Sequence, residues 1–546
     1  MSPKRISLFI FLSLCILLIL MFFSNSIIVS GNRQETGFKI ADFFIKYPNT
    51  SAFLYEDKPV INQKADSLIQ IADSIIHIIG EDVMDADFKP HIPDFSKIDT
   101  ASIVRIAYPA HPIAKPDQTS GAPLIENLVS HLESGSCRIL HYGDSQLEGD
   151  RITGYLRNRL QGVYGGSGPG FIPVKQVYNQ LAADITVSEN WYRFAIFDPT
   201  QKITPEKDYG LYASFSRFTA KGASDHDSLS VENLFTTRAT ITIKPSAKSY
   251  GRLKKYNLIR LHYGNAAYPV KVRIFHNGNL FSESSLIADK AYHCFEISTD
   301  ATPAELTIEL EGKVSPDFYG ITLDADAGVS VDNIAMRGGS GTIFSKMNPP
   351  GFRSMAQLLD PDVLIFQFGG NTIPYVKDSA SINDYARYLM GNIKWVKRNI
   401  PGSVIMFIGP SDMSTMVNGE MVTYPLLPYL DKTLKAACLA NGIAYWSMFE
   451  AMGGLNSMKY WVEKGLAASD YTHFSPAGTR IISELFFTAL YLDLKAVSNQ
   501  QSAVSSQQSA ISSQQSAISN QQSAVSRQQS AFSSQQSAQS EGQTVN

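Results

Sequence analysis

The stretch that decides this fold is His141-Tyr142-Gly143-Asp144-Ser145-Gln146-Leu147-Glu148-Gly149. The four residues before it, Cys137-Arg138-Ile139-Leu140, are typical of a short buried strand. After it, apolar residues recur every three or four positions from Ile152 to Val163, which predicts an amphipathic helix. A strand that stops at a glycine and restarts as a helix places Ser145 at the helix N-terminus, where free backbone N–H groups would stabilise an oxyanion.

Gly-Asp-Ser alone is weak evidence for catalysis, because these are also the commonest turn and N-cap residues. Three later stretches strengthen the hypothesis. In chain order they are Asp332-Asn333-Ile334-Ala335-Met336-Arg337-Gly338-Gly339, Phe368-Gly369-Gly370-Asn371 and Asp470-Tyr471-Thr472-His473. Each of the first two lies at the end of an apolar run, and the order of all four motifs is far more specific than any one of them.

In this order of motifs the chain resembles the SGNH (GDSL-type) hydrolase family, over roughly residues 135–172 and 328–492. The resemblance implies a three-layer α/β/α domain of flavodoxin-like type with five parallel strands. It also implies a serine esterase that needs no cofactor and no metal.

Ester hydrolysis by serine requires a base, a group that orients the base, and donors for the oxyanion. The base would be His473 acting on Ser145, and Asp470 would hold the imidazole tautomer. In the family the oxyanion hole combines the serine N–H, a glycine N–H and an asparagine amide, which carry over to Ser145, Gly338 and Asn371. Gly338 is chosen over its neighbour Gly339 because it lies three residues after Ala335, near the end of the strand.

Each of these residues also has a purely structural interpretation. Asp470 and His473 could be an N-cap and a surface histidine before a helix, and Asn371 could be a turn residue. Asp144 is predicted to be a structural turn residue. Asp412 could line the pocket or form an Asx-turn.

Composition excludes several other classes of protein. The 546 residues are 44% hydrophobic and 18% charged, which allows a large core and two or more domains. With 47 Lys and Arg against 50 Asp and Glu, the chain lacks the excess of positive charge that is typical of nucleic-acid-binding proteins. The four cysteines are widely separated without a CxxC, so free thiols are predicted instead of a disulfide scaffold or a zinc site.

The N-terminus carries a hydrophobic segment. Lys4 and Arg5 precede an uncharged run from Ile6 to Phe23, which is long enough to cross a bilayer, particularly if Ile27 to Val29 extend it. Residues 1–30 are therefore predicted to be a membrane anchor, with the catalytic domain on the periplasmic or extracellular side. A cleaved signal peptide is the alternative, but the run exceeds a usual h-region and no Ala-x-Ala site follows.

Residues 31–120 are interpreted as a spacer that partly packs on the main domain, with a helix near Ala65 to Ile79 and a Pro-rich connector after it. The hydrolase domain would occupy residues 121–174 and 328–495. The Gly-rich segment 164–171 is predicted to be a loop near the active site, with a helix C-cap and turn as the alternative.

Residues 175–327 show period-two alternation separated by turns, which predicts a β-sandwich of jelly-roll type. His276-Asn277-Gly278-Asn279 is typical of a type I′ hairpin. Peptidoglycan O-acetylesterases of the SGNH group carry a carbohydrate-binding-like jelly roll at this point. Sugar binding and a structural role both remain open. The aromatic residues considered for stacking on sugars are Trp191, Tyr192, Phe194, Tyr209, Tyr212 and Tyr263, most of which are expected in the core.

From residue 328 strand-length apolar runs alternate with helical patterns, which predicts a parallel sheet covered on both faces. The predicted strands are 138–142, 329–336, 363–368, 404–408 and 443–446. All proposed motifs fall at the carboxyl ends of strands, where such sheets bind ligands. A Ser381/Asp384 capping box is expected before one helix, and Ser475 is expected to cap the last.

Residues 496–546 form a seven-residue repeat rich in Ser and Gln, with one apolar residue and an adjacent Ala in each period. Burial per residue is too small to offset chain ordering, so a disordered tail is predicted, with a weak helical oligomer as the alternative.

Together these features predict a membrane-anchored serine esterase that removes O-acetyl or other short acyl groups from a cell-wall or other polysaccharide. The expected partners are the acylated polysaccharide and the membrane, with no nucleic acid; the oligomeric state is left open. An O-acyltransferase using the same triad is one alternative, and a non-catalytic wall-binding protein is another.

Overall fold

A five-stranded parallel sheet lies at the centre of this computed structural model, which describes residues 3–30, 33–40, 43–49, 61–79, 95, 98–109, 124–222 and 231–541. In spatial order the strands are β16 (Gly328–Ala335), β4 (Ser136–Gly143), β17 (Val363–Gln367), β18 (Val404–Ile408) and β21 (Ala444–Trp446). Every neighbouring pair is parallel. The five predicted strands and their parallel arrangement are confirmed.

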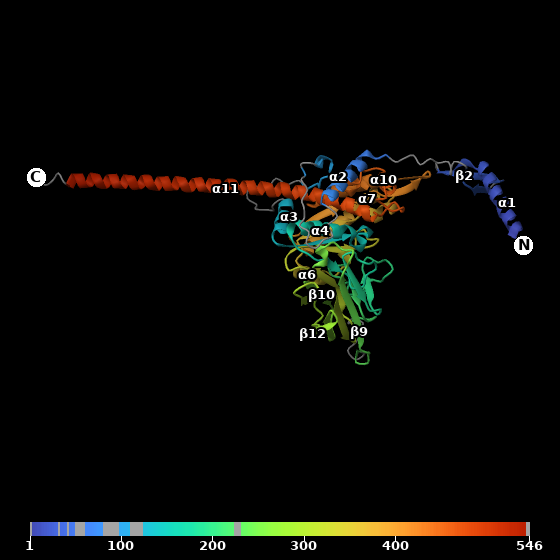
Figure 1. The fold of residues 1–546 in the computed structure, drawn as a ribbon, viewed down its shortest axis with the longest axis horizontal. Helices are drawn as coiled ribbons and strands as arrows, with labels where there is room; N and C mark the ends of the chain where they lie inside the picture. Colours follow the sequence, from blue (N-terminus) through green and yellow to red (C-terminus); the bar gives the residue numbers. More distant parts are fainter. Residues whose placement is uncertain are drawn as a thin grey trace.

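Helices cover both faces of this sheet (Figure 1). Leu140 and Tyr142 of β4 enter the core on one face, and Cys137 and Ile139 enter the core on the other, as the period of two requires. The first face is covered by α6 (Pro349–Leu359), α7 (Ser379–Asn399) and α8 (Leu427–Ala440). The second is covered by α2 (Gln63–Ile79), α3 (Leu124–Glu133), α4 (Arg151–Tyr164), α9 (Met448–Ala451), α10 (Ser457–Glu463) and α11 (Pro476–Glu541). The predicted α/β/α layering is confirmed.

Two helix starts can be compared with their predicted caps. Ser475 caps α11, since its Oγ accepts a hydrogen bond from the Gly478 amide. The capping box of α7 joins Asp378 to Ser381. The predicted Ser381/Asp384 box was therefore wrong by three residues, because Ser381 fills the N3 position of a helix that begins one turn earlier.

A second unit interrupts the α/β domain between β4 and β16 and consists of two antiparallel sheets packed on a core of their own. One sheet has the order β13-β10-β15-β8-β7, and the other has the order β12-β11-β14-β9-β6. The bounds are β6 (Ala183–Val187), β7 (Tyr192–Ala195), β8 (Ser214–Arg217), β9 (Thr237–Pro245), β10 (Leu258–Gly264), β11 (Val270–His276), β12 (Asn279–Ser285), β13 (His293–Ser298), β14 (Leu306–Gly312) and β15 (Asp317–Asp324). The predicted inserted β-sandwich is confirmed.

Two details of the sandwich bear on the sequence predictions. Asn277 and Gly278 have φ of 50° and 80° between paired β11 and β12, so the type I′ turn is confirmed. Strand β5 (Gly170–Ile172) pairs with β15. Residues 170–172, which the sequence assigned to the hydrolase, therefore join a sandwich sheet.

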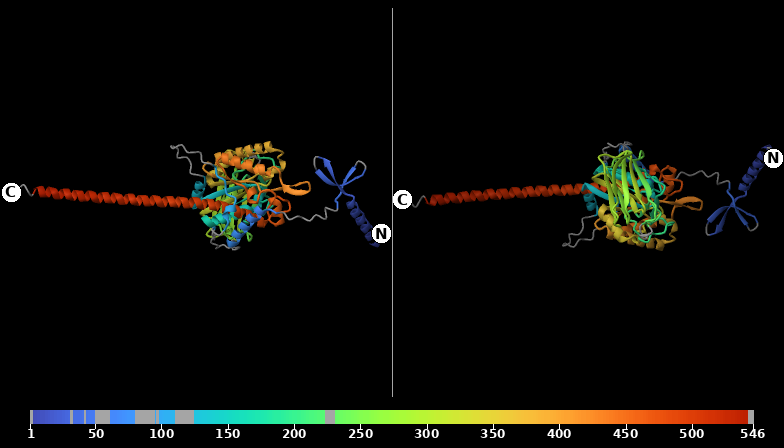
Figure 2. Two further views of the ribbon diagram at one scale, coloured as in Figure 1. Left: turned by 90° about the horizontal axis from the view of Figure 1, so that it is seen from above. Right: turned by 90° about the horizontal axis from the view of Figure 1, so that it is seen from below.

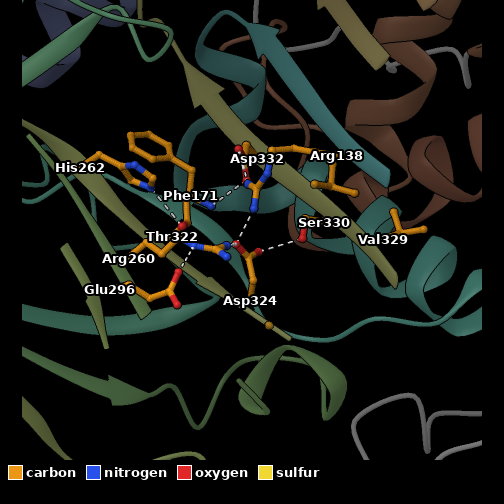
Figure 3. A network of polar contacts seen from close by, with 12 residues as sticks. Arg138, Phe171, Arg260, His262, Glu296, Thr322, Asp324, Val329, Ser330 and Asp332 are labelled. Carbon is orange, nitrogen blue, oxygen red and sulfur yellow. Dashed lines mark hydrogen bonds and ion pairs between the residues drawn. The ribbon is translucent and has the colours of Figure 1, made fainter. Parts of the chain in front are cut away.

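A buried ion cluster joins the sandwich to the central sheet (Figure 3). The guanidinium of Arg138 on β4 donates through Nη1 to both carboxylate oxygens of Asp332 on β16, at 2.8 Å each. Its Nη2 donates to Asp324 on β15 of the sandwich. Phe171 and Tyr212 donate further hydrogen bonds to Asp332, at 3.0 and 3.1 Å. Burial alone would lower the pKa of Arg138, but the two carboxylates hold it well above its usual value.

The Gly-rich segment lies away from the cleft that holds Ser145, so its prediction as an active-site loop was wrong. Gly165 ends α4 with φ of 82°, as the alternative interpretation proposed. A Cβ on Gly166 would come within 2.6 Å of the Val329 backbone, and one on Gly168 within 2.3 Å of the Leu323 carbonyl. These glycines are needed because the chain crosses close to β15 and β16.

The N-terminal segment contains α1 (Pro3–Phe22) and a small sheet. Lys4–Phe22 has a mean hydropathy of 2.6 and is long enough to cross a membrane. Residues 25–30 form β1 (Asn25–Ser30), which pairs with β2 (Arg33–Ile40), and β2 pairs with β3 (Phe43–Lys46). Ile27 to Val29 therefore do not extend the span, because this β-branched run pairs as a strand.

Part of the predicted spacer belongs to the α/β domain. Ala65, Leu68 and Ala72 of α2 are fully or almost fully buried in the core beneath α11. Ala107 forms an antiparallel bridge to Tyr445 and so covers the β21 edge of the sheet. Most of the Pro-rich connector and the predicted boundary at residue 120 lie outside the described residues.

The C-terminal helix α11 runs from the body of the protein to Glu541 and projects straight away from it (Figures 1 and 2). The predicted disorder from residue 496 is thus contradicted by a continuous helix. No Gly or Pro lies between residues 479 and 541, and the Ala and Gln of the repeat are compatible with a helix. Ile511, Ile518 and Val525 are more than half exposed along this part.

The remaining short elements flank the loops at the carboxyl edge of the sheet and within the sandwich. They are η4 (Thr100–Ser102), η5 (Ser145–Asp150), η7 (Arg252–Lys254), η8 (Phe344–Lys346), η9 (Gly370–Tyr375), β19 (Ser414–Val417) and β20 (Glu420–Thr423).

Removing Arg138 should destabilise the protein strongly. Arg138→Ala leaves two buried carboxylates without a cation, and breaking a buried pair in this way costs about 3–5 kcal/mol. Lys271→Ala breaks the half-exposed pair with Glu283 and should cost only about 0–1 kcal/mol. Urea unfolding of both variants measures the difference. Equal losses would show that the cluster does not hold the two units together.

Candidate active site

Ser145 lies on the tight turn that follows β4. The Asp144 side chain accepts a hydrogen bond from the Gln146 amide at 3.0 Å, which confirms Asp144 as a turn residue. Ser145 begins the short 3₁₀ segment η5, and α4 begins six residues later, so the serine does not lie at the α4 N-terminus as predicted. The left-handed conformations of Gly149 (φ 69°) and Asp150 (φ 64°) separate the two helices.

The structure brings the three predicted catalytic side chains into one hydrogen-bonded row. Ser145 Oγ lies 2.8 Å from His473 Nε2, and His473 Nδ1 lies 2.8 Å from Asp470 Oδ2. Asp470 Oδ1 accepts the backbone amides of Thr472 and His473, at 2.9 and 3.0 Å. Burial would raise the pKa of Asp470, but the hydrogen bonds from His473 and Thr472 outweigh it and hold the pKa below its usual value. The carboxylate therefore stays charged where it can stabilise an imidazolium.

The expected oxyanion donors line the same cleft as Ser145 and His473. The Gly339 amide donates to the Met336 carbonyl at 2.8 Å, whereas the amides of Gly338 and Ser145 have no acceptor in the described part of the chain. This difference favours Gly338 over Gly339. Asn371 Nδ2 donates one hydrogen to the Gly339 carbonyl at 3.0 Å, which orients the amide and leaves its second N–H.

Two positioning residues were missed by the sequence analysis. Gln146 Nε2 donates to the Thr472 carbonyl at 2.7 Å. Arg151 donates through Nη2 to the Ser145 carbonyl at 2.8 Å and through Nη1 to the Phe474 carbonyl at 3.4 Å. Both side chains tie the serine turn to the histidine loop. Their places next to the serine motif were visible in the sequence, but their partners more than 300 residues away were not.

Asp412 has neither of its two predicted roles. It is fully buried, and its Oδ2 accepts hydrogen bonds from the Met458 amide at 2.7 Å and Ser457 Oγ at 3.2 Å. It therefore secures the start of α10 and does not line the cleft.

The cleft that contains Ser145 has a volume of about 1330 Å³. Its walls come from the α/β domain, including α2, and from two loops of the sandwich. Beside the serine, the guanidinium of Arg337 lies 4.8 Å from the ring centroid of Tyr178 and 3.9 Å from Glu148. The sandwich thus forms one side of the catalytic cleft.

No family model matches this sequence, and no curated protein matches it. A solved structure of a peptidoglycan O-acetylesterase aligns with a TM-score of 0.53 and 21% identity, covering 69% of this chain and 98% of that one. A family two carbohydrate esterase from Clostridium thermocellum, in complex with cellohexaose, aligns with a TM-score of 0.22 and 11% identity over 48% and 96% of the two chains. Another, from Cellvibrio japonicus, aligns with a TM-score of 0.22 and 10% identity over 57% and 99%. The likeness in fold rests on the first of these, and it agrees with the SGNH-type fold expected from the motifs.

Asp470→Asn should remove most activity while the fold remains. The asparagine oxygen can keep the two backbone hydrogen bonds, but its NH₂ would face His473 Nδ1 and force the proton onto Nε2. The base could then no longer accept the serine proton, and kcat for p-nitrophenyl acetate should fall about 10³–10⁴-fold. Asp384→Asn, which alters an exposed carboxylate paired with Arg387 on α7, is the control. A fall below tenfold for Asp470→Asn would contradict the proposed tautomer control.

Asp144 should make stability depend on pH. Burial raises its pKa to about 6, whereas in an unfolded chain it is about 4. The folded state therefore binds this proton more tightly, so the stabilisation is complete below about pH 4 and is lost as pH rises through 6. Asp144→Asn keeps the acceptor for the Gln146 amide and removes the titration. The Tm of the variant minus that of the wild type should increase between pH 4 and 7 in calorimetry. A difference independent of pH would show that folding leaves the pKa of Asp144 unchanged.

Proposed function

We propose that this chain is a serine esterase that removes O-acetyl or other short acyl groups from a cell-wall or other polysaccharide through an acyl-enzyme. One observation carries the proposal. Ser145, His473 and Asp470 form a continuous row of hydrogen bonds in the wall of an open cleft, beside backbone amides that have no acceptor in the described residues.

In this mechanism Ser145 Oγ attacks the acyl carbon while His473 Nε2 takes its proton. Asp470 stabilises the resulting imidazolium. The negative charge that develops on the carbonyl oxygen is met by the N–H groups of Ser145 and Gly338 and by the second N–H of Asn371, each worth roughly 3 kcal/mol in comparable hydrolases. His473 then protonates the departing sugar oxygen, which leaves the acyl group on Ser145.

Water completes the cycle by attacking the acyl-enzyme, with His473 again as the base. The side chains of His473 and Asp470 are 33% and 50% exposed, so solvent reaches this step directly. This openness supports hydrolysis over transfer of the acyl group to a second sugar. A purely wall-binding protein would have no physical need for the ordered row of three side chains.

The carbohydrate part of the proposal has two supports. The overall fold resembles that of a solved peptidoglycan O-acetylesterase, and the antiparallel sandwich that borders the cleft is consistent with the carbohydrate-binding-like insertion expected from the order of the motifs. The volume of the cleft, about 1330 Å³, leaves room for a bulky alcohol component beside the scissile ester.

The location of the enzyme is also a proposal. The apolar side chains of α1 are exposed on all sides, and Lys4 and Arg5 stand at its start. This arrangement supports an N-terminal membrane anchor, or a signal sequence, with the catalytic domain on the periplasmic or extracellular side.

Ser145→Ala should abolish turnover without unfolding the protein. The full-length chain in detergent would be treated with a fluorophosphonate probe and assayed with p-nitrophenyl acetate and butyrate. Wild type should be labelled and should prefer acetate, whereas the variant should show neither labelling nor turnover above background.

Ser354→Ala, which removes an exposed hydroxyl on α6, is the matched control and should behave as wild type. Near-normal turnover by Ser145→Ala would refute the proposed nucleophile. Absence of labelling in folded wild-type protein would instead favour the wall-binding alternative.

A further inference from the structure

The catalytic cleft is longer than a short acyl ester requires. Its volume of about 1330 Å³ exceeds the range of about 300–1000 Å³ that small-ligand pockets occupy. Both Arg151 and Tyr155 of α4 line it, so it continues along this helix for about 6 Å beyond the serine turn. The cleft therefore has a second end, away from the catalytic residues.

This distal end is built by the sandwich loop between β9 and β10. Lys248, Ser249, Tyr250 and Leu253 of this loop all line the cleft. The ring of Tyr250 meets that of Tyr155 edge-on, with centroids 6.0 Å apart and an interplanar angle of 80°. Tyr155 is itself fixed by a hydrogen bond from its hydroxyl to Glu484 at 2.6 Å. Tyr250 is thus held at the boundary between the hydrolase and the sandwich.

Polar atoms without partners mark the same end of the cleft. Ser249 is only 2% exposed, yet its Oγ has no hydrogen-bond partner in the part of the chain that the structure describes. The hydroxyl of Tyr250 likewise has no partner among the described residues, and burial raises its pKa to about 12, so it is a neutral donor and acceptor. A buried hydroxyl such as Ser249 Oγ is seldom left unpaired, and a partner that both donates and accepts hydrogen bonds, such as a water or a ligand hydroxyl, can pair with it.

A sugar unit meets these requirements. Its hydroxyls can pair with Ser249 Oγ and the Tyr250 hydroxyl, and its apolar C–H face can pack on an aromatic ring. The aromatic residues considered from the sequence cannot do this. Four of them, Trp191, Tyr209, Tyr212 and Tyr263, are no more than 2% exposed, and the exposed Tyr192 does not line the cleft.

We propose that Ser249 and Tyr250 form a distal sugar subsite of the cleft in which Ser145 acts. The sandwich then binds the same glycan chain that is being deacylated, one or more sugar units from the ester, and not a separate wall polymer. This inference rests on the proposed esterase function.

The test compares substrates of different length. kcat/KM would be measured in the full-length enzyme for p-nitrophenyl acetate and for O-acetylated oligosaccharides of two and six units, with both chitin and xylan backbones. In the wild type, kcat/KM for the six-unit substrate should exceed that for the two-unit substrate about tenfold on at least one of the two sugar backbones. A tenfold ratio is the effect of one good contact. Tyr250→Ala and Ser249→Val should reduce this preference to within about twofold.

Tyr250→Phe removes only the hydroxyl and should give an intermediate preference for the six-unit substrate. This variant keeps the ring, so it tests the subsite even if the alanine variant misfolds. Tyr192→Ala, an exposed aromatic of the sandwich outside the cleft, should keep the wild-type preference. Equal losses on p-nitrophenyl acetate and on the six-unit substrate would overturn the subsite, and so would the absence of any length preference in the wild type.

A binding measurement separates this inference from the esterase proposal. Calorimetry with Ser145→Ala and unacetylated six-unit oligosaccharides should show binding that is about tenfold weaker in the Ser145→Ala, Tyr250→Ala double variant. If the wild type fails to hydrolyse any ester but this difference is seen, the esterase fails and the subsite stands. If the esters are hydrolysed and Tyr250 makes no difference to binding, the subsite fails alone.

Discussion

One guanidinium holds the two halves of this molecule in register. Arg138 neutralises Asp332 of the central sheet and Asp324 of the sandwich at once, and all three side chains are almost completely buried. Charges taken out of water must be paired with good geometry, so the two units can approach only where both carboxylates reach the same cation. Such a cluster contributes less to net stability than to the choice of one orientation. Because the catalytic cleft lies between the two units, its shape depends on that orientation.

At the other end of the strands, the site around Ser145 is also held in place by side chains that join distant segments. Here they do so through hydrogen bonds to backbone carbonyls and not through buried ion pairs. Gln146 and Arg151 bind backbone carbonyls of the histidine loop and of the serine turn. Through these hydrogen bonds they fix the distance between the two segments. Asp470 is held in turn by two backbone amides, so its second oxygen can point only at His473. Each reacting side chain is therefore positioned by a neighbour that does not react.

Much of this arrangement was predictable from the sequence. The five parallel strands and the Asn277-Gly278 turn follow from local periodicity and turn chemistry, and the order of the motifs marked the strand ends where the site lies. The partners of Gln146 and Arg151 were not predictable, since they depend on contacts between distant segments. The Gly-rich segment was misplaced because close packing against backbone and a flexible loop require the same residue. The tail was predicted to be disordered because its repeat offers few apolar side chains to bury. No Gly or Pro lies between residues 479 and 541, however, so nothing there breaks a helix.

The topology explains why the sandwich borders the active site. Among the described residues β16 is an edge strand of the sheet and pairs with β4. Ser145 follows β4, whereas Gly338 follows β16, and the sandwich occupies the chain between those two strands. The chain enters the sandwich after α4 and returns at the amino end of β16, while the sandwich loops at residues 178–182 and 248–253 reach the cleft that Ser145 and Gly338 line. These two loops form one wall of that cleft. The place of the insertion, directly before β16, thus brings the sandwich next to the strand that Gly338 follows.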